Sequence, residues 1–343
     1  MTFRFPKTGL AIAAFTFAAA AAAATNPGWM RVETNVPAMG GTFSIIAYGP
    51  DASVLRSATE AAGEEARRLE LAMSNYVPGS EWSEVNREGS RGPVKISGEM
   101  FDLIADCVRY SRASEGAFDI TVGPLMQVWG FYKGSGHLPH RAEVRTALAR
   151  IGYRNIELDA ANHTVRFRKD GMNIDPGGIG KGYAVDRMAD ILKQYGIQSA
   201  LISAARSSIY AIGTPPGEPG WRAQIRHPRD GSQVAAEVVM RDESMSTSGN
   251  YEKFFEAEGK LYSHIMDPRT GFPAQGMIQV SVITPRTIDS EAWTKPVYIQ
   301  GREWAANHLP KGFRAYICED RPEPRGPFTA ARVGEKEPCA WLR

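Results

Sequence analysis

Apolar and polar positions change between strand and helix periods along the chain, which predicts a mixed fold. Residues 30–48 alternate and are rich in Val, Thr, Phe and Ile, so they predict two strands around a turn at residues 37–41. Residues 51–73 predict a helix, because apolar side chains recur at helical spacing: Leu55, Ala58, Ala62, Ala66, Leu69 and Met73. Ser97 predicts the N-cap of another helix, on whose apolar face Cys107 lies.

The remaining pattern mixes strands and helices without regular alternation. Strands are predicted at residues 156–158, 164–168, 172–175, 200–203, 208–212, 221–226, 235–240, 261–266 and 277–284. Further helices are predicted at residues 143–151 and 288–300. We expect residues 221–226 and 235–240 to continue the sheet of the preceding strands. No repeat or linker divides the chain, so the pattern favours one α+β domain over a doubly wound sheet.

One stretch, residues 175–195, joins a glycine-rich turn to a helix. The turn occupies residues 176–180, and the helix that follows has an apolar stripe: Ala184, Met188, Ile191, Leu192 and Tyr195. Such a turn offers backbone N–H groups and the positive end of the helix dipole to a phosphate. However, Gly182 follows Lys181 where a P-loop needs Ser or Thr, and the glycine spacing differs from the dinucleotide fingerprint. Alone, the turn is open to a structural and an anion-binding interpretation.

Composition limits the classes of protein to which this chain can belong. The chain has 343 residues, of which 43% are hydrophobic, enough for a full core. Its formal charge of +2, without a basic stripe interleaved with aromatics, argues against a nucleic-acid partner. Cys318 and Cys339 lie near the C-terminus, and an oxidising compartment would permit them to pair. The sequence contains no C-x-x-C motif, and no close grouping of His and Cys residues suggests a zinc site.

The N-terminus has the pattern of a secretory signal peptide. Arg4 and Lys7 are basic, and the alanine-rich apolar run at residues 9–24 ends in small residues. An uncleaved membrane anchor is the alternative, but the run is short and weakly hydrophobic for a span. We therefore predict a signal peptide at residues 1–24 and a mature domain at residues 25–343, exported, periplasmic and soluble, without a stable membrane span.

Six segments together resemble the ApbE family, the FAD:protein FMN transferases. In chain order they are residues 39–42 (MGGT), 74–76 (SNY), 117–125 (AFDITVGPL), 175–187 (DPGGIGKGYAVDR), 247–251 (TSGNY) and 262–271 (YSHIMDPRTG). Several motifs in one order are far more specific than any one of them. The resemblance extends over roughly residues 30–305.

This resemblance implies a fold, a reaction and two partners. The fold would be a single α+β domain of the ApbE type, related to the T-fold. FAD, the substrate, would bind in a cleft with Mg²⁺ near its pyrophosphate. A Thr or Ser hydroxyl of an acceptor protein would attack the FMN phosphorus, so that AMP leaves and FMN stays attached through a phosphoester.

The resemblance also implies roles for individual residues. His264 is the expected base for the attacking hydroxyl, because histidine can accept a proton near neutral pH. The residues expected to line the flavin site are Met39, Tyr76, Ala117, Phe118, Asp119, Asp175, Lys181 and Ile265. Lys181 would neutralise phosphate charge, and the ring of Tyr76 would stack. Asp175 would accept hydrogen bonds from adenine or ribose, or support a metal. The backbone of Gly178 would face the metal ion.

Each of these residue types also has a structural interpretation. A histidine on a strand before a turn, as His264 is expected to be, often serves only packing and hydrogen bonding. Asp119 fits a cap of the turn that precedes it equally well. Tyr76 alone is a core or rim aromatic, and Asp267 with Arg269 is a pair that stabilises a turn.

One segment departs from the family pattern after the central helix. The family usually carries an Asn-Ala-Gly-Gly-Asp-Ile type segment there, whereas residues 204–209 read AARSSI. The glycines that would allow close approach to the ligand, and the acid, are missing. Arg206 would add positive charge near the phosphates or fill part of the cleft.

A second departure concerns the expected metal ligands. The family has an Asp and, four residues on, a Thr, and counting back from Gly301 places Glu291 and Lys295 there. Lysine has no lone pair for a cation, so it would repel the ion or pair with phosphate or Glu291 in its stead. A one-residue slip in the alignment would place Thr294 at the site. The ligands expected for Mg²⁺ are therefore Gly178, Glu291 and Thr294.

These departures leave two alternative functions open. One is a periplasmic FAD-binding protein whose catalysis is lost or altered. The other is an FAD pyrophosphatase, in which water takes the place of the acceptor hydroxyl and FMN and AMP are released.

Overall fold

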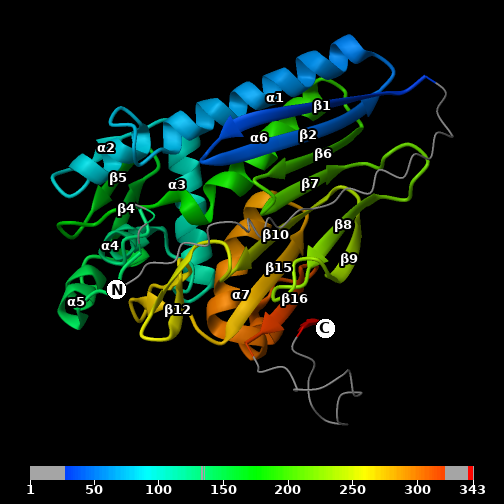
Figure 1. The fold of residues 1–343 in the computed structure, drawn as a ribbon. Coiled ribbons are helices and arrows are strands. Elements are labelled where there is room, and N and C mark those ends of the chain that lie inside the picture. Colours follow the sequence, from blue (N-terminus) through cyan, green and yellow to red (C-terminus); the bar gives the residue numbers. More distant parts are fainter. Residues whose placement is uncertain (1–27, 133, 135, 321–338, 343) are drawn as a thin grey trace, which may run out of the picture.

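An antiparallel sheet organises the molecule (Figure 1), of which the computed structural model describes residues 28–132, 134, 136–320 and 339–342. Its eight strands follow the order β1-β2-β6-β7-β10-β15-β16-β17. Their bounds are β1 Met30–Ala38, β2 Gly41–Gly49, β6 Ser199–Ala204, β7 Ser208–Ile212, β10 Glu243–Gly249, β15 Met277–Thr284, β16 Arg314–Glu319 and β17 Cys339–Trp341. Every neighbouring pair is antiparallel, and the predicted hairpin at residues 30–48 is confirmed as β1 and β2.

Three helices cover one face of this sheet: α1 (Ala52–Met73), α6 (Gly180–Gln194) and α7 (Thr287–His308). All six apolar positions predicted for the first of them are buried. In α6 the predicted stripe holds at Ala184, Met188 and Leu192, but Tyr195 is 45% exposed. The prediction was wrong at this position, which is the C-cap of the helix, one residue beyond its last residue Gln194.

A separate hairpin, β8 (Trp221–Arg226) with β9 (Val234–Met240), covers the opposite face. The prediction that these strands continue the main sheet is therefore wrong. Their alternation explains the difference: Trp221, Ala223 and Ile225 are buried against the main sheet, and the residues between them are exposed or half-buried. Because both faces of the main sheet are covered, every residue of β6 and of β15 is buried.

The segment between α1 and α6 lies at one end of the sheet (Figure 1). Its elements are α2 (Glu81–Glu88), β3 (Val94–Lys95), α3 (Gly98–Ala113), η1 (Ile120–Val122), α4 (Gly123–Val128), α5 (Arg141–Leu148), η2 (Tyr153–Asn155), β4 (Ile156–Asp159), β5 (Thr164–Phe167) and η3 (Pro176–Gly178). The predicted cap is confirmed, since the Ser97 hydroxyl accepts the N–H of Met100 at 3.3 Å. The short α2 was not predicted.

The strand predicted at residues 172–175 is not present as a strand. Side chains bind its backbone instead of a neighbouring strand: the Ile174 carbonyl accepts from the Trp82 indole at 3.0 Å and from the Asn86 amide at 3.0 Å. The Ile174 N–H donates to Asn86 Oδ1 at 2.7 Å, and the Asp175 N–H donates to the Ile120 carbonyl. With its hydrogen bonds satisfied in this way, the segment leads straight into the glycine-rich turn.

Four short strands complete the fold: β11 (Phe254–Ala257), β12 (Lys260–Ser263), β13 (Met266–Asp267) and β14 (Phe272–Pro273). The strand predicted at residues 261–266 is thus divided in two, which leaves His264 and Ile265 between β12 and β13. The α+β class expected from the sequence is confirmed. Within the described ranges, no helix combines the length and the hydropathy that crossing a membrane requires.

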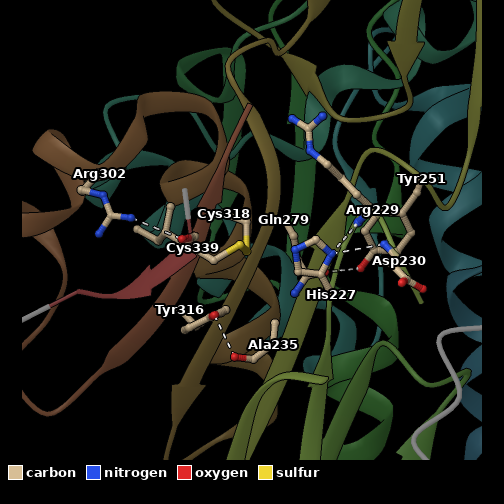
Figure 2. The surroundings of a disulfide bond; sticks show 11 residues. His227, Arg229, Asp230, Ala235, Tyr251, Gln279, Arg302, Tyr316, Cys318 and Cys339 are labelled. Atoms are coloured by element: carbon tan, nitrogen blue, oxygen red, sulfur yellow. Dashed lines mark hydrogen bonds between the residues drawn. A yellow bond between two sulfur atoms is a disulfide. The ribbon is translucent and has the colours of Figure 1, made fainter. Parts of the chain in front are cut away.

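A disulfide attaches the last described strand to the sheet (Figure 2). Cys318 of β16 and Cys339 of β17 are direct partners in the antiparallel register, and the structure joins them. The pairing that the sequence left open is therefore made. Cys107 is free and buried, as predicted.

The N-terminus of α7 is capped from α6, and we expect loss of this cap to weaken the fold. Arg286 precedes α7 without a side-chain cap, whereas the Asp186 carboxylate accepts the N–H groups of Thr287 at 2.7 Å and Ile288 at 2.9 Å. We expect Asp186→Ala to lower the free energy of unfolding by about 1–2 kcal/mol in denaturant titrations. Asp190→Ala, on the exposed side of α6, is the matched control and should change it by less than about 0.5 kcal/mol. Equal effects of the two variants would contradict the capping role.

Candidate functional site

Segments far apart in the sequence meet at the N-terminal end of α6. The Gly182 N–H donates to the Glu291 carboxylate of α7. A Cβ placed on Gly178 would lie 3.5 Å from Lys295 Cε, also of α7. The glycine-rich turn and one side of α7 therefore form the walls of the site.

Gly178 of this turn and Gly182 of α6 have different surroundings, which bear differently on the need for glycine. A Cβ on Gly182 would lie 2.6 Å from the Thr287 carbonyl and 2.7 Å from Glu291 Oε2, closer than such atoms approach. Only glycine lets α7 pack this tightly against α6, which explains why the Ser or Thr of a P-loop is missing here. A Cβ on Gly178 would make ordinary contacts with Lys295 and Phe118, both at 3.5 Å, so this position borders the site without closing it.

His264 lies beside this turn, with one ring nitrogen held by the backbone. The backbone N–H of His264 donates to the Lys253 carbonyl at 3.0 Å, and the ring atom Nδ1 lies 3.1 Å from the same oxygen. A carbonyl can only accept, so the ring proton belongs on Nδ1 and Nε2 keeps its lone pair. Burial, together with the positive charges of Lys253, Lys181 and Lys295, lowers the pKa of His264 to about 4. The imidazole is therefore neutral at pH 7 and able to accept a proton through Nε2.

Lysine side chains give the site its positive charge. Lys181 Nζ donates to the Ser207 hydroxyl at 2.6 Å, and Lys295 Nζ donates to the Glu291 carbonyl at 3.0 Å. Burial lowers the pKa of Lys295; the charge of Glu291 opposes this change, and that of Lys181 adds to it. Lysines that converge on a helix N-terminus suit phosphate oxygens, which accept charge-assisted hydrogen bonds.

Asp175, which caps the glycine-rich turn, lies near two tyrosines. Asp175 Oδ1 accepts the Gly177 N–H at 2.7 Å, and burial raises the pKa of the carboxyl. Burial and the charge of Asp175 raise the pKa of Tyr132. Tyr76 is 72% exposed, meets the Tyr132 ring edge-on at 6.3 Å and donates from its hydroxyl to the Tyr132 carbonyl at 3.4 Å. This places Tyr76 at the rim, where its ring is open to stacking.

Two residues of the site were missed by the sequence analysis. Tyr132 follows an aromatic cluster, Trp129 and Phe131 around Gly130, and that cluster is the sequence signal that points to it. Lys253 follows the TSGNY segment, where a single lysine gives no signal of its own. Its proximity to His264 and Asp175 is established by the packing of the segment between β10 and β11.

The remaining predicted flavin residues lie at different depths. Phe118 is buried and turns a ring carbon toward Gly178, and its chain neighbour Ala117 is buried too. Ile265, which follows His264 in the chain, is also buried. Met39, with φ of 50°, lies in the turn between β1 and β2. The Met39 N–H donates to Glu70 Oε1 at 2.8 Å. The start of β2, just after this turn, lies against the β6–β7 turn, because the Ala205 N–H donates to the Thr42 carbonyl at 2.9 Å.

Asp119 has both carboxylate oxygens occupied by the protein. Oδ1 accepts the N–H of Thr121 at 2.9 Å and its hydroxyl at 2.7 Å, and Oδ2 accepts the Tyr153 N–H at 2.8 Å. This geometry supports the capping interpretation over direct contact with a ligand. Asp267 and Arg269 likewise pair with each other within their turn, at 2.9 Å.

The donor set expected for magnesium does not come together. Glu291 Oε2 accepts the Gly182 N–H, and Oε1 lies 3.9 Å from Lys295 Nζ. The Thr294 hydroxyl donates to the Glu291 carbonyl and accepts from Ser248, both at 2.8 Å, and its side chain is fully buried. Among residues that the structure describes, no group of three or more His, Cys, Asp and Glu side chains could hold a metal. Mg²⁺ in proteins is usually held by one or two carboxylates together with water and substrate phosphates, and the one carboxylate of this set, Glu291, already contacts Gly182 and Lys295.

The altered segment after β6 keeps a left-handed backbone without glycine. Ala205 has φ of 46° and Arg206 has φ of 62°, a conformation that costs roughly 1–2 kcal/mol per residue outside glycine. Arg206 lines a small depression of about 20 Å³ together with Thr247, Tyr251, Glu252 and Gln279, among others. The charges of Lys181 and Lys295 act on Glu252, so this depression adjoins the lysines of the site.

Comparison with known proteins supports one family. The family model described as the ApbE family matches residues 39–317. An FAD:protein FMN transferase of Salmonella typhimurium is 31% identical over 240 residues, which are 68% of this chain and 68% of that protein. An FAD:protein FMN transferase of Treponema pallidum is 31% identical over 252 residues, 69% of each chain.

Solved structures show the same fold. The ApbE protein of Thermotoga maritima superposes with a TM-score of 0.79 at 29% identity, covering 85% of this chain and 95% of the other. The flavin transferase ApbE of Vibrio cholerae superposes with a TM-score of 0.75 at 25% identity, covering 85% and 94%.

Proposed function

The chain belongs to the ApbE family of flavin transferases, and from this premise we propose that it is an exported FAD:protein FMN transferase. It moves FMN from FAD to a Thr or Ser hydroxyl of an acceptor protein and releases AMP. The observation that carries the proposal is His264, with Nε2 free to accept a proton, beside lysines at a glycine-rich helix N-terminus.

The chemistry follows from the positions of these groups. The acceptor hydroxyl gives its proton to Nε2 of His264 while its oxygen attacks the FMN phosphorus. The bond between that phosphorus and the bridging oxygen of the pyrophosphate breaks, and the oxygen leaves with AMP. Lys181 at the start of α6 offers positive charge to the phosphates as the charge on the leaving group grows. Asp175 and the Tyr76 ring would hold the rest of the dinucleotide.

Export is supported by two independent features. The Cys318–Cys339 disulfide is typical of an oxidising compartment. The signal peptide predicted at residues 1–24 lies outside the described residues, so it remains a prediction from the sequence.

The proposal is tested with the mature chain, FAD and an acceptor domain that a related FAD:protein FMN transferase modifies. We expect the acceptor to carry covalently attached FMN, seen as a fluorescent band after denaturing electrophoresis. One AMP should be released for each FMN transferred. An acceptor whose target hydroxyl is replaced, Thr→Ala, is the control and should stay unmodified.

Other outcomes of this assay would favour the two alternative functions. AMP released at the same rate without acceptor would indicate an FAD pyrophosphatase. Bound FAD with neither AMP release nor a labelled band would indicate a flavin-binding protein without transfer activity.

A further inference from the structure

The side chain of Lys295 extends from α7 toward the glycine-rich turn. Its Cε lies 3.5 Å from the Cβ position of Gly178, and its Nζ lies 3.9 Å from Glu291 Oε1. Residues on a helix one position apart point about 100° away from each other, so Thr294 cannot share this direction. Thr294 instead turns to Ser248 of β10. A cation of the protein itself therefore lies where the family pattern has a metal ligand.

We propose that Lys295, together with Lys181, takes the place of a divalent cation at the FAD pyrophosphate, so that FAD binding and FMN transfer need no added metal. This inference rests on the proposed function, because it concerns how that same site holds its substrate. It extends the function by assigning to the lysine a role that a metal ion would otherwise have.

The charges and hydrogen bonds of the two lysines fit this role. Two ammonium groups carry the same charge as one divalent ion. Each is already oriented by one bond, Lys181 to the Ser207 hydroxyl and Lys295 to the Glu291 carbonyl. An ammonium has three N–H donors, so each lysine keeps two for phosphate oxygens. The Lys295 side chain is 22% exposed, which leaves it accessible to a ligand in the site.

Glu291 acts in this arrangement as a partner of the protein and not as a metal ligand. One of its oxygens accepts the Gly182 N–H, and the other faces Lys295. Binding a divalent ion to the oxygen that faces Lys295 would place the ion beside two positive side chains and in competition with Lys295 for that oxygen. The geometry thus favours the direct pairing of lysine with phosphate over a metal bridge.

Measurements of FAD affinity test the role of Lys295 without depending on FMN transfer. The dissociation constant of the mature chain for FAD is determined by flavin fluorescence in EDTA and in millimolar MgCl₂. We expect wild-type values that agree within roughly threefold, because the lysines are permanent parts of the site. Lys295→Thr should bind FAD at least roughly tenfold more weakly in EDTA and should recover part of that loss when MgCl₂ is added.

Two further variants separate charge from folding. Lys295→Arg keeps the charge and should still bind FAD in EDTA, whereas Lys295→Met should lose affinity that MgCl₂ does not restore. Lys311→Thr, at an exposed lysine after α7, is the matched control and should bind as wild type does. Circular dichroism melts show whether each variant is folded. If Lys295→Thr does not fold, the comparison of Lys295→Arg with Lys295→Met tests the role of the charge.

The results distinguish this inference from the proposed function. Wild-type affinity that rises tenfold or more with MgCl₂, or Lys295→Met that binds FAD in EDTA as well as wild type, would overturn the role of Lys295 and leave the transferase intact. Transfer to the acceptor in EDTA at the rate seen in MgCl₂ would support it. Tight FAD binding without transfer in either buffer would contradict the proposed function. The FAD affinities of the Lys295 variants would still test whether this lysine replaces a metal ion.

Discussion

FMN transfer by His264→Asn should be slower than transfer by the wild type by about 10²–10⁴-fold, with FAD still bound. Asparagine is close in size and its amide can donate to the Lys253 carbonyl, as Nδ1 of the histidine does at 3.1 Å. What the variant lacks is the lone pair of Nε2, so the acceptor hydroxyl loses its base. The rate is measured as covalent labelling of the acceptor at saturating FAD, and affinity by fluorescence titration.

A second histidine of the chain provides a matched control. His308, 40% exposed at the end of α7, also has Nδ1 against a backbone carbonyl, that of Trp304 at 2.9 Å. His308→Asn should therefore transfer FMN at the wild-type rate. A His264→Asn protein that retains more than about a tenth of the wild-type rate would exclude His264 as the base, and the structural interpretation of this residue would then stand.

The pH dependence of kcat/KM for FAD should show an acidic limb near pH 4, well below the usual range of histidine. This parameter reports groups of the free enzyme, and burial with nearby lysines lowers the pKa of His264 to about 4. Because the imidazolium form is disfavoured, the neutral base persists as the pH falls and is lost only on passing through that pKa. At pH 5 about 90% of the activity should remain, against about 3% for a histidine with a pKa of about 6.5.

Bound FAD should move this limb upward. The negative pyrophosphate offsets the lysine charges, so imidazolium forms more easily in the complex, and the limb of kcat should lie above that of kcat/KM. Initial rates between pH 3.5 and 8, with circular dichroism at each pH to confirm folding, provide both profiles. A limb of kcat/KM near pH 6.5 would contradict the effect of burial and lysines on His264.

Local patterns in the sequence were sufficient for much of the fold. The β1–β2 hairpin, α1 and the cap at Ser97 all follow from spacing and capping chemistry within a few residues. Two of the failures, the β8–β9 hairpin and the strand predicted at residues 172–175, depend on partners distant in sequence. The hairpin of β8 and β9 has an ordinary strand pattern, and only its packing on the other face shows that it does not join the main sheet.

The same division applies to the site. His264, Asp175 and Lys181 were named from motifs, and the structure brings them to one end of α6. Asp119 was named from the same kind of motif, yet its oxygens are taken by Thr121 and Tyr153. A motif identifies a segment near a ligand, whereas the direction of each side chain is decided by the neighbours that compete for it.

By itself, the sequence determined the family, the glycine-rich turn before a helix, and the departure from the family pattern near residue 295. It did not determine whether Thr294 or Lys295 faces Gly178, because an alignment shifted by one residue fits either. A shift of one position rotates a helical side chain by about 100°, so the choice depends on how α7 lies against α6. That packing, which requires glycine at residue 182, turns Thr294 toward Ser248 and presents Lys295 to the site.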